Sequence, residues 1–456
     1  MFGVSPVCRK MLLKYGGDMV SDEFFYCFSD SKIMENMIKY INKNFGNKWG
    51  ISVSKKNDDF FKEKKLWSEV KDELLGCYLK PYIQKILNTR KPVVYVDCFA
   101  GKGIFEDGKH GSPLIALDTM RDCLRHTQVE GCSIAPYFID LNYAEELRKN
   151  VSAYKVPDKN IINGKYEDEI TKVLSDKEGC NLFLYIDPYG IKALNHKFFD
   201  EFACSKRYNS VELLINLNSF GFIREGCRVL GVNFGDEAML EDLVEYETTK
   251  LERNEKSVNL LNEIAGGDYW QEIIQNKNRG IIDTKEAEKL FADQYCDRLK
   301  RNYRYVLNMP LRLKRGQAPK YRMVHATNHV SGCLLMVDNI CNRWQLMKDI
   351  QTCGQMSLFT EDIDNRIIDD VELDKRVKEH IQGYQQLERL NDILADFFMK
   401  NGPICTTGKI KDTYKSLEKL GKIVVVRTPS VTDKTGKPSR FFADEKGKTT
   451  KLRWQS

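Results

Sequence analysis

Residues 181–194 read NLFLYIDPYGIKAL, and this stretch joins an apolar run to a polar turn. The run LFLYI at residues 182–186 has the length and composition of a buried strand. It ends at Asp187-Pro188-Tyr189-Gly190, and two interpretations of these four residues are open. They form either only a turn or a clamp for a flat ring that carries an amine. The residues at the ends of the neighbouring strands help to distinguish between these two interpretations.

Strands and helices alternate on both sides of this run. Five strand-like runs share the pattern and lie at residues 92–99, 134–142, 160–164, 181–190 and 210–218. Because helical segments separate them, the sequence predicts an α/β fold with a doubly wound, mostly parallel Rossmann-like sheet and helices on both faces.

Further elements are expected around this sheet. Ser112 and Pro113 should form the N-cap and first turn of the helix after the first strand. Residues 235–302 should form a helical insertion. Residues 304–313 and 321–329 should form an antiparallel pair at the sheet edge.

The first strand leads into VDCFAGKG at residues 96–103, where Asp97 precedes a turn that contains Gly101 and Gly103. Ligands of open α/β sheets bind beyond the carboxyl ends of the strands, and glycines let the backbone approach them closely. Asp140 ends the second strand, where a carboxylate commonly binds the ribose hydroxyls of a nucleoside cofactor. The alternatives are a tight turn for the first motif and a surface role for Asp140.

The acidic residues after this turn distinguish between cofactor classes. A dinucleotide site needs a third glycine near a helix N-terminus to hold a pyrophosphate. Glu106 and Asp107 follow Gly103 instead, and two carboxylates would repel a pyrophosphate. S-adenosylmethionine has no phosphate and carries a sulfonium and an ammonium, so it is the expected cofactor. Phe99 and Ala100 lie in the same turn and are expected to contact it.

A donor bound there would place its methyl group near the end of the fourth strand. The Asp187 carboxylate and the Pro188 carbonyl could accept the N–H groups of an exocyclic amine, and Tyr189 could stack on the base. Such stacking contributes roughly 1–3 kcal/mol per base. Positioning of this kind lowers the barrier to in-line transfer from sulfur to nitrogen. Either Asp187 or water would take the released proton.

These motifs resemble those of Rossmann-like S-adenosylmethionine-dependent methyltransferases. The fourth-strand motif is similar to the Asp-Pro-Pro-Tyr of nucleic-acid amino methyltransferases, and closer to the Asp-Pro-Phe-Gly of transfer-RNA guanosine-N2 dimethyltransferases. Over about residues 60–360 the chain resembles the bacterial three-Cys-motif partner family, through YVDCFAGKG, LFLYIDPYG and HATNHVSGCLLM. The resemblance implies a methyltransferase fold and a possible partner protein from a neighbouring gene. In Rossmann-like methyltransferases, an acidic residue after the third strand often contacts the adenine amine of the cofactor. Lys165 occupies that position here, so Glu167 or Asp168 is expected to make this contact instead.

Composition limits the remaining function classes. Fourteen scattered cysteines without a C-x-x-C pair favour reduced thiols in a cytoplasmic protein over disulfides or zinc. Of the six histidines only His325 and His329 lie close together in the sequence, so a metal site is not expected. No run approaches the roughly eighteen apolar residues of a membrane span, so no membrane partner is expected.

The net charge of +6 is concentrated near the C-terminus, since residues 385–456 carry fifteen Lys and Arg against eight Asp and Glu. A helix, a lysine-faced helix and a hairpin with a basic tip predict a winged-helix module. Such a module would bind either nucleic acid or another protein. The cations expected to contact a polyanion are Lys409, Lys411, Lys415, Lys419, Lys434, Lys437 and Arg440.

The expected domains are an N-terminal helical segment at 1–59, a methyltransferase-like domain at 60–348, an acidic linker at 349–384 and the basic module at 385–456. The leading hypothesis is methylation of an exocyclic amine on a base of RNA or DNA. The alternatives are a non-catalytic partner that keeps the fold, and an amine methyltransferase that acts on a small molecule or a protein.

Overall fold

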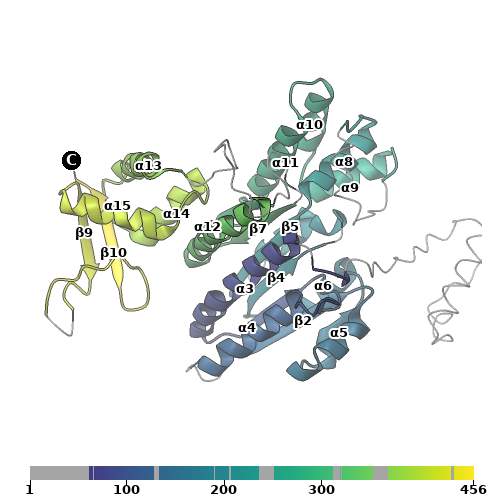
Figure 1. Ribbon diagram of the computed structural model, residues 1–456, viewed down its shortest axis with the longest axis horizontal. Helices are drawn as coiled ribbons and strands as arrows, with labels where there is room; N and C mark the ends of the chain where they lie inside the picture. Colours follow the sequence, from purple (N-terminus) through teal and green to yellow (C-terminus); the bar gives the residue numbers. More distant parts are fainter. Residues whose placement is uncertain are drawn as a thin grey trace, which may run out of the picture. The chain divides into compact units, whose positions relative to one another are not determined.

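The computed structural model describes residues 61–64, 66–127, 133–188, 190–204, 207–235, 251–311, 319, 321–352, 368–432 and 436–455 (Figure 1). The expected N-terminal segment at 1–59, together with Tyr189 and Lys434, lies outside these residues.

A seven-stranded sheet, ordered β3-β2-β1-β4-β5-β7-β6, forms the centre of the fold. Its strands are β1 (Val93–Asp97), β2 (Ile134–Asp140), β3 (Ile161–Asn163), β4 (Asn181–Ile186), β5 (Ser210–Leu217), β6 (Tyr305–Leu311) and β7 (Tyr321–Thr327). Strands β1 to β5 are parallel, β7 is antiparallel to β5, and β6 is antiparallel to β7. The mostly parallel α/β sheet and the antiparallel pair at its edge are therefore confirmed.

The order of β3-β2-β1-β4-β5 has a switch point between β1 and β4, where the chain direction across the sheet reverses. Dinucleotide-binding sheets share this order but continue with a sixth parallel strand. Here the reversed strand β7 lies between β5 and β6 instead. The fold is thus Rossmann-like with an antiparallel edge.

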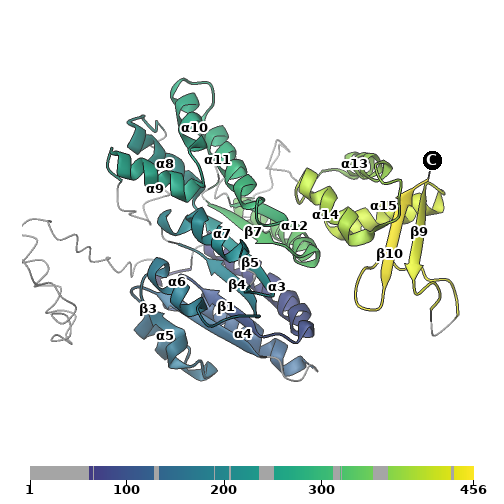
Figure 2. The ribbon, with the colours of Figure 1, turned by 180° about the vertical axis from the view of Figure 1, so that it is seen from behind.

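Two layers of helices bury the two faces of the sheet (Figures 1 and 2). The first layer consists of α3 (Leu66–Ile86), α4 (Ser112–His126) and α12 (Val330–Thr352), with α5 (Ala144–Asn150) beside β3. The second layer consists of α6 (Tyr166–Leu174), α7 (His196–Cys204), α8 (Ser219–Leu230), α9 (Glu255–Ala265), α10 (Tyr269–Asn278) and α11 (Thr284–Leu299). The last three helices agree with the predicted helical insertion.

Strand β4 explains why the sequence contains an unbroken apolar run at this point. Phe183 and Tyr185 face the layer of α3, whereas Leu184 and Ile186 face the layer of α6 and α7. All six residues of the strand are buried. A strand with both faces covered has no polar alternation, as expected for the centre of a parallel sheet.

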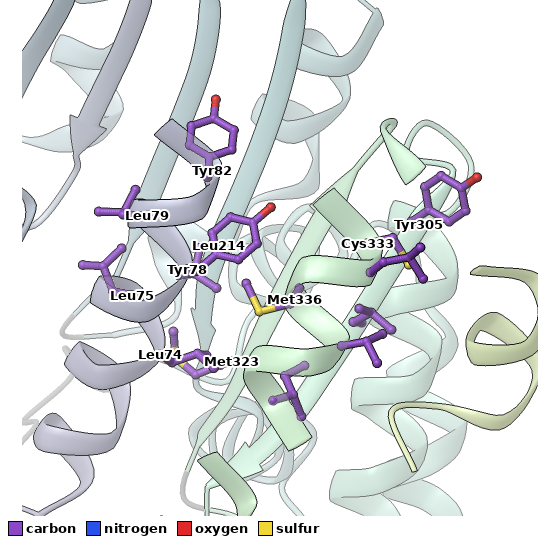
Figure 3. Close-up of a cluster of buried hydrophobic side chains, with 14 of the residues drawn as sticks. Leu74, Leu75, Tyr78, Leu79, Tyr82, Leu214, Tyr305, Met323, Cys333 and Met336 are labelled. Carbon is purple, nitrogen blue, oxygen red and sulfur yellow. The ribbon is translucent and has the colours of Figure 1, made fainter. Parts of the chain in front are cut away.

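Helix α3 packs closely against α12 (Figure 3). Leu74 and Tyr78 of α3 lie with Met336 of α12 in one buried cluster. Beneath them the Tyr78 hydroxyl donates to Glu212, and His325 lies 3.2 Å from the same carboxylate. The histidine of β7 therefore takes part in a buried polar network on this face of the sheet.

The C-terminal elements are α13 (Asp370–Gln382), β8 (Glu388–Arg389), α14 (Leu390–Asn401), α15 (Thr407–Lys419), β9 (Ile423–Thr428) and β10 (Thr449–Trp454). The strands form an antiparallel sheet ordered β8-β10-β9. Helix α13 lies in the segment that was expected to be an acidic linker. Its Leu373, Val377 and Ile381 are buried in the core. They are spaced four residues apart and form one apolar helix face, which the acidic residues between them made hard to recognise in the sequence.

Among the residues that the structure describes, no helix is both long enough and apolar enough to cross a membrane.

The buried pair Arg322–Glu288 joins β7 to α11 and provides a test of the fold. The guanidinium donates twice to the carboxylate, at 2.6 and 2.8 Å, and the two side chains are 2% and 0% exposed. Arg322→Met should lower the free energy of unfolding by about 3–5 kcal/mol, because it leaves a buried charge unpaired. Urea denaturation measures the change.

Two further variants complete this test. Adding Glu288→Leu to Arg322→Met should recover much of the lost stability, because neither charge then remains. Asp297→Ala breaks the exposed Lys300–Asp297 pair and should change stability by less than about 1 kcal/mol. A double variant less stable than Arg322→Met would contradict this account.

Candidate functional site

A pocket that opens to solvent lies at the carboxyl edge of the sheet. It is lined by Phe61, Ser68, Lys71, Asp72, Phe99, Ala100, Gly101, Gly103, Phe105, Gly111, Ser112 and Asp187. These residues come from the segment before β1, the loop after β1, the start of α4 and the end of β4. The pocket therefore lies at the switch point of the sheet, where ligands of this architecture bind.

The loop between β1 and α4 requires two of its glycines. Gly101 and Gly103 have φ angles of 61° and 77°, in the left-handed region. A Cβ on Gly103 would also lie 2.7 Å from side-chain carbons of Leu114 and Leu147. The loop can therefore pass this closely over the helices only without side chains at these positions.

Ser112 does not act as the predicted N-cap. Gly111 occupies the cap position of α4, and Ser112 is the first helical residue. The Ser112 hydroxyl instead lies near the Asp97 carboxylate, whose pKa it helps to lower. Ser112 also lines the pocket.

Asp97 is fully buried at the end of β1. Its Oδ1 accepts the Phe99 N–H at 3.3 Å, whereas Oδ2 accepts no hydrogen bond from the described residues. The pKa of Asp97 is raised to about 8, mainly by burial and also by the carboxylates of Asp187 and Asp72, against the opposing effects of the Ser112 hydroxyl and the Phe99 N–H. The carboxyl is thus largely protonated at neutral pH, and a cation nearby would favour its ionised form.

Asp140 connects the end of β2 to the glycine loop. Its Oδ2 accepts the Gly101 N–H, and its Oδ1 accepts the N–H groups of Asn142 and Tyr143, all at 2.8 Å. Burial raises the pKa of this carboxyl, and the three N–H groups partly offset that effect. Asp140 is therefore beside the loop as expected, but it does not line the pocket. Its contact with a ribose stays a prediction.

Asp187 and Pro188 follow β4, and the Asp187 carboxylate lines the pocket. Oδ2 of Asp187 accepts a hydrogen bond from Lys71 Nζ at 2.6 Å, and Oδ1 accepts one from Asn216 Nδ2 at 2.6 Å. The Tyr185 hydroxyl lies 3.4 Å from Oδ2. The acid that the sequence singled out is therefore held by a buried lysine and a buried amide.

The sequence analysis missed Lys71 and Asn216. Lys71 is 3% exposed and lies on α3, 116 positions before Asp187 in the chain. A signal was present, because Lys71 falls on the apolar stripe that continues through Leu74 and Tyr78. A lysine in such a stripe is seldom buried without a partner.

A second ion pair was also missed on the same side of the pocket. Lys64 Nζ lies 2.6 Å from Asp72 Oδ2 and also donates to the His110 carbonyl at 2.7 Å. The pKa of Asp72 is raised to about 6, because burial and the Asp187 carboxylate outweigh the lowering effects of Lys64 and Lys71. The two buried lysines Lys64 and Lys71 thus pair with two carboxyl groups of the pocket lining, Asp72 and Asp187.

The other residues predicted to contact the cofactor differ in whether they line the pocket. Phe99, Ala100, Gly101 and Gly103 line the pocket. Glu167 lies half-buried in the first turn of α6 and does not contribute to the lining.

The predicted polyanion contacts differ in their surroundings. Lys409 pairs with Asp370 of α13 at 2.7 Å, and Lys415 pairs with Asp412 at 2.7 Å. For Lys411, Lys437 and Arg440, the described part of the chain supplies no ion pair. Lys409 is therefore the member of the set that is already neutralised by another helix.

No protein-family model matches the chain, and a search of curated proteins finds no significant match. The described residues also contain no group of three or more His, Cys, Asp or Glu that could hold a metal ion.

The raised pKa of Asp97 predicts a pH dependence of stability. The folded-state value of about 8 exceeds the reference value of 3.8, so the folded protein keeps a proton that the unfolded chain releases. Stability from this group is complete below about pH 4 and is lost as the pH rises to about 8. Asp97→Asn removes this loss, so its stability relative to wild type should grow by up to about 1.4 kcal/mol per pH unit.

Urea unfolding of both proteins at pH 5, 6, 7 and 8 measures this difference. Asp72, whose pKa is about 6, is present in both proteins and contributes to both curves. Parallel curves across this range would show that Asp97 ionises normally.

Proposed function

We propose that the protein is an S-adenosylmethionine-dependent methyltransferase that acts on an exocyclic amine of a nucleic-acid base. The observation that carries the proposal is the meeting of Asp187 with the glycine loop of β1 in one pocket at the switch point of the sheet. The antiparallel β7 agrees with the Rossmann-like methyltransferase fold that the sequence resembles. Membership of the three-Cys-motif partner family forms part of the same proposal.

The residues present fit this cofactor. Asp97 Oδ2 and Ser68 Oγ are buried and have no hydrogen-bond partner among the described residues, and the ammonium of a methionyl group could supply donors. The acidic surroundings favour a cation and disfavour a pyrophosphate. Phe61 and Phe105 add apolar surface to the lining. When bound, the cofactor supplies an electrophilic methyl group.

The protein's own residues would bind and orient the acceptor. The amine of a base is a weak nucleophile, because its lone pair is delocalised into the ring. Asp187 can accept one N–H of that amine and the Pro188 carbonyl can accept the other, which aligns the lone pair. As a C–N bond replaces the S–C bond, the nitrogen loses one proton, and Asp187 or water accepts it.

The C-terminal elements support a winged-helix module that holds the nucleic acid. Their order is helix, strand, two helices and two strands, as in α13-β8-α14-α15-β9-β10. The N-terminal end of α15 is covered, since the Thr407 N–H and hydroxyl donate to Asp338 of α12 at 2.7 and 2.8 Å. Recognition helices read bases through that end. Lys411, Lys415 and Lys419 lie further along α15 and suit contacts with phosphates instead.

Asp187→Ala should abolish methyl transfer and leave donor binding within about twofold. The carboxylate acts on the acceptor amine, whereas the loop of β1 holds the donor. Calorimetry with S-adenosylmethionine measures binding, with NAD as the comparison ligand. Transfer of a labelled methyl group to total RNA, genomic DNA and protein measures activity.

The matched control is Asp122→Ala, which removes an exposed acid of α4. Its activity should equal that of wild type. Full turnover by Asp187→Ala would exclude the proposed role of this acid. Tight binding of NAD in place of S-adenosylmethionine would overturn the proposed function.

Reversing the charges of Lys411, Lys415 and Lys419 together should weaken nucleic-acid binding. Each lost phosphate contact makes the negative slope of log K, the binding constant, against log salt concentration shallower by about 0.9 for duplex DNA and about 0.7 for a single strand. The control reverses Lys285 and Lys289 of α11 and Lys300 at its C-terminal cap, which changes net charge equally. Equal slopes for the two triple variants would favour the alternative of protein docking.

A further inference from the structure

Lys71 occupies an unusual position for a lysine. Its side chain is 3% exposed, and its ammonium lies 2.6 Å from Asp187 Oδ2 and 5.5 Å from the centre of the Tyr321 ring. On the same face of α3, Leu74 and Leu75 are buried apolar residues and Ser68 is a buried polar one. A buried ion pair gives little net stability, because desolvation of both charges offsets their attraction. Stability alone therefore does not account for a lysine at this position.

The lysine and Asn216 together fix the carboxylate of Asp187. An ionised carboxylate only accepts hydrogen bonds, so the amide of Asn216 must present its Nδ2 to Asp187. Its Oδ1 is then a buried acceptor with no partner among the described residues. With one donor on each oxygen, the carboxylate cannot rotate freely, and its remaining lone pairs face in fixed directions.

The same ammonium limits which amines can approach. A lysine side chain or a polyamine would bring a second cation within about 4–5 Å of Lys71 Nζ if it docked on the same carboxylate. Compared with the same carboxylate without Lys71, repulsion between like charges at that distance weakens the binding of a cationic amine on the order of a hundredfold or more. The exocyclic amine of a base is neutral and meets no such repulsion.

We propose that Lys71 is a positioning and specificity-determining residue, which fixes the Asp187 carboxylate toward the acceptor and excludes cationic amines from the site. This inference rests on the proposed function and narrows its substrate class to neutral amines. It also disfavours the alternative in which a protein lysine or a small ammonium compound is the acceptor.

The test compares Lys71→Met with Lys71→Arg in the full-length protein, using labelled methyl transfer to mixed RNA and DNA oligonucleotides and to a lysine-rich peptide. Lys71→Met should lower kcat for oligonucleotides roughly a hundredfold and leave the KM for the donor within about twofold. Lys71→Arg keeps the charge and should recover most of the activity. Lys71→Met should also reduce the preference for oligonucleotide over peptide by about tenfold or more.

Lys80→Met on the exposed side of α3 is the matched control, and its activity should equal that of wild type. If Lys71→Met keeps the kcat of the wild-type protein and its preference for oligonucleotide over peptide, the inference is wrong. Equal transfer to peptide and oligonucleotide by wild type would overturn the exclusion of cations.

A second measurement does not depend on methyl transfer. Urea unfolding of Lys71→Met, Asp187→Asn and the double variant forms a double-mutant cycle. Coupling of at least about tenfold in the unfolding constant is expected, because each single variant leaves a buried partner unpaired. If the two substitutions change stability additively, Lys71 and Asp187 do not form the inferred ion pair. If they are coupled but the wild-type protein transfers no methyl group, the proposed function and the specificity that rests on it are wrong.

Discussion

Charge buried at the carboxyl edge of the sheet is the constraint on which the site depends. Asp97 ends β1 and Asp187 directly follows the adjacent β4, and a buried charge needs a partner that offsets its lost hydration. Helix α3 supplies a cation to Asp187, and the segment before it supplies another to Asp72. Among the described residues Asp97 has no cationic partner, and burial raises its pKa. Of the two acids, only Asp187 is paired with a lysine.

This division connects the fold to the proposed chemistry. The switch point between β1 and β4 brings the two acids together, while the loop glycines keep the space above them open. A cationic donor on the side of Asp97 and a neutral acceptor on the side of Asp187 would meet between them. Under the proposed function, the two acids would therefore face different reactants.

Local pattern was enough to predict the sheet, because strands such as β4 are continuous apolar runs and the helices between them keep their periodicity. It also identified Asp97, Gly101 and Asp187, since strand ends in this architecture are ligand positions. Lys71 was not identified, because its partner lies 116 residues away and no local rule pairs them. Helix α13 was not identified either, because three apolar residues among many acids resemble a solvated linker.

The wall of the pocket carried by α3 has a consequence for synthesis of the chain. Asn339 Nδ2 of α12 donates to the Leu74 carbonyl of α3 at 2.7 Å, across 265 positions. The helix that bears Lys71 therefore leaves the ribosome long before the segment that holds it in place. Contacts of such long range form late. A nascent chain that ends before α12 would contain β1 to β5 and the glycine loop, but not the contact that supports this wall of the pocket.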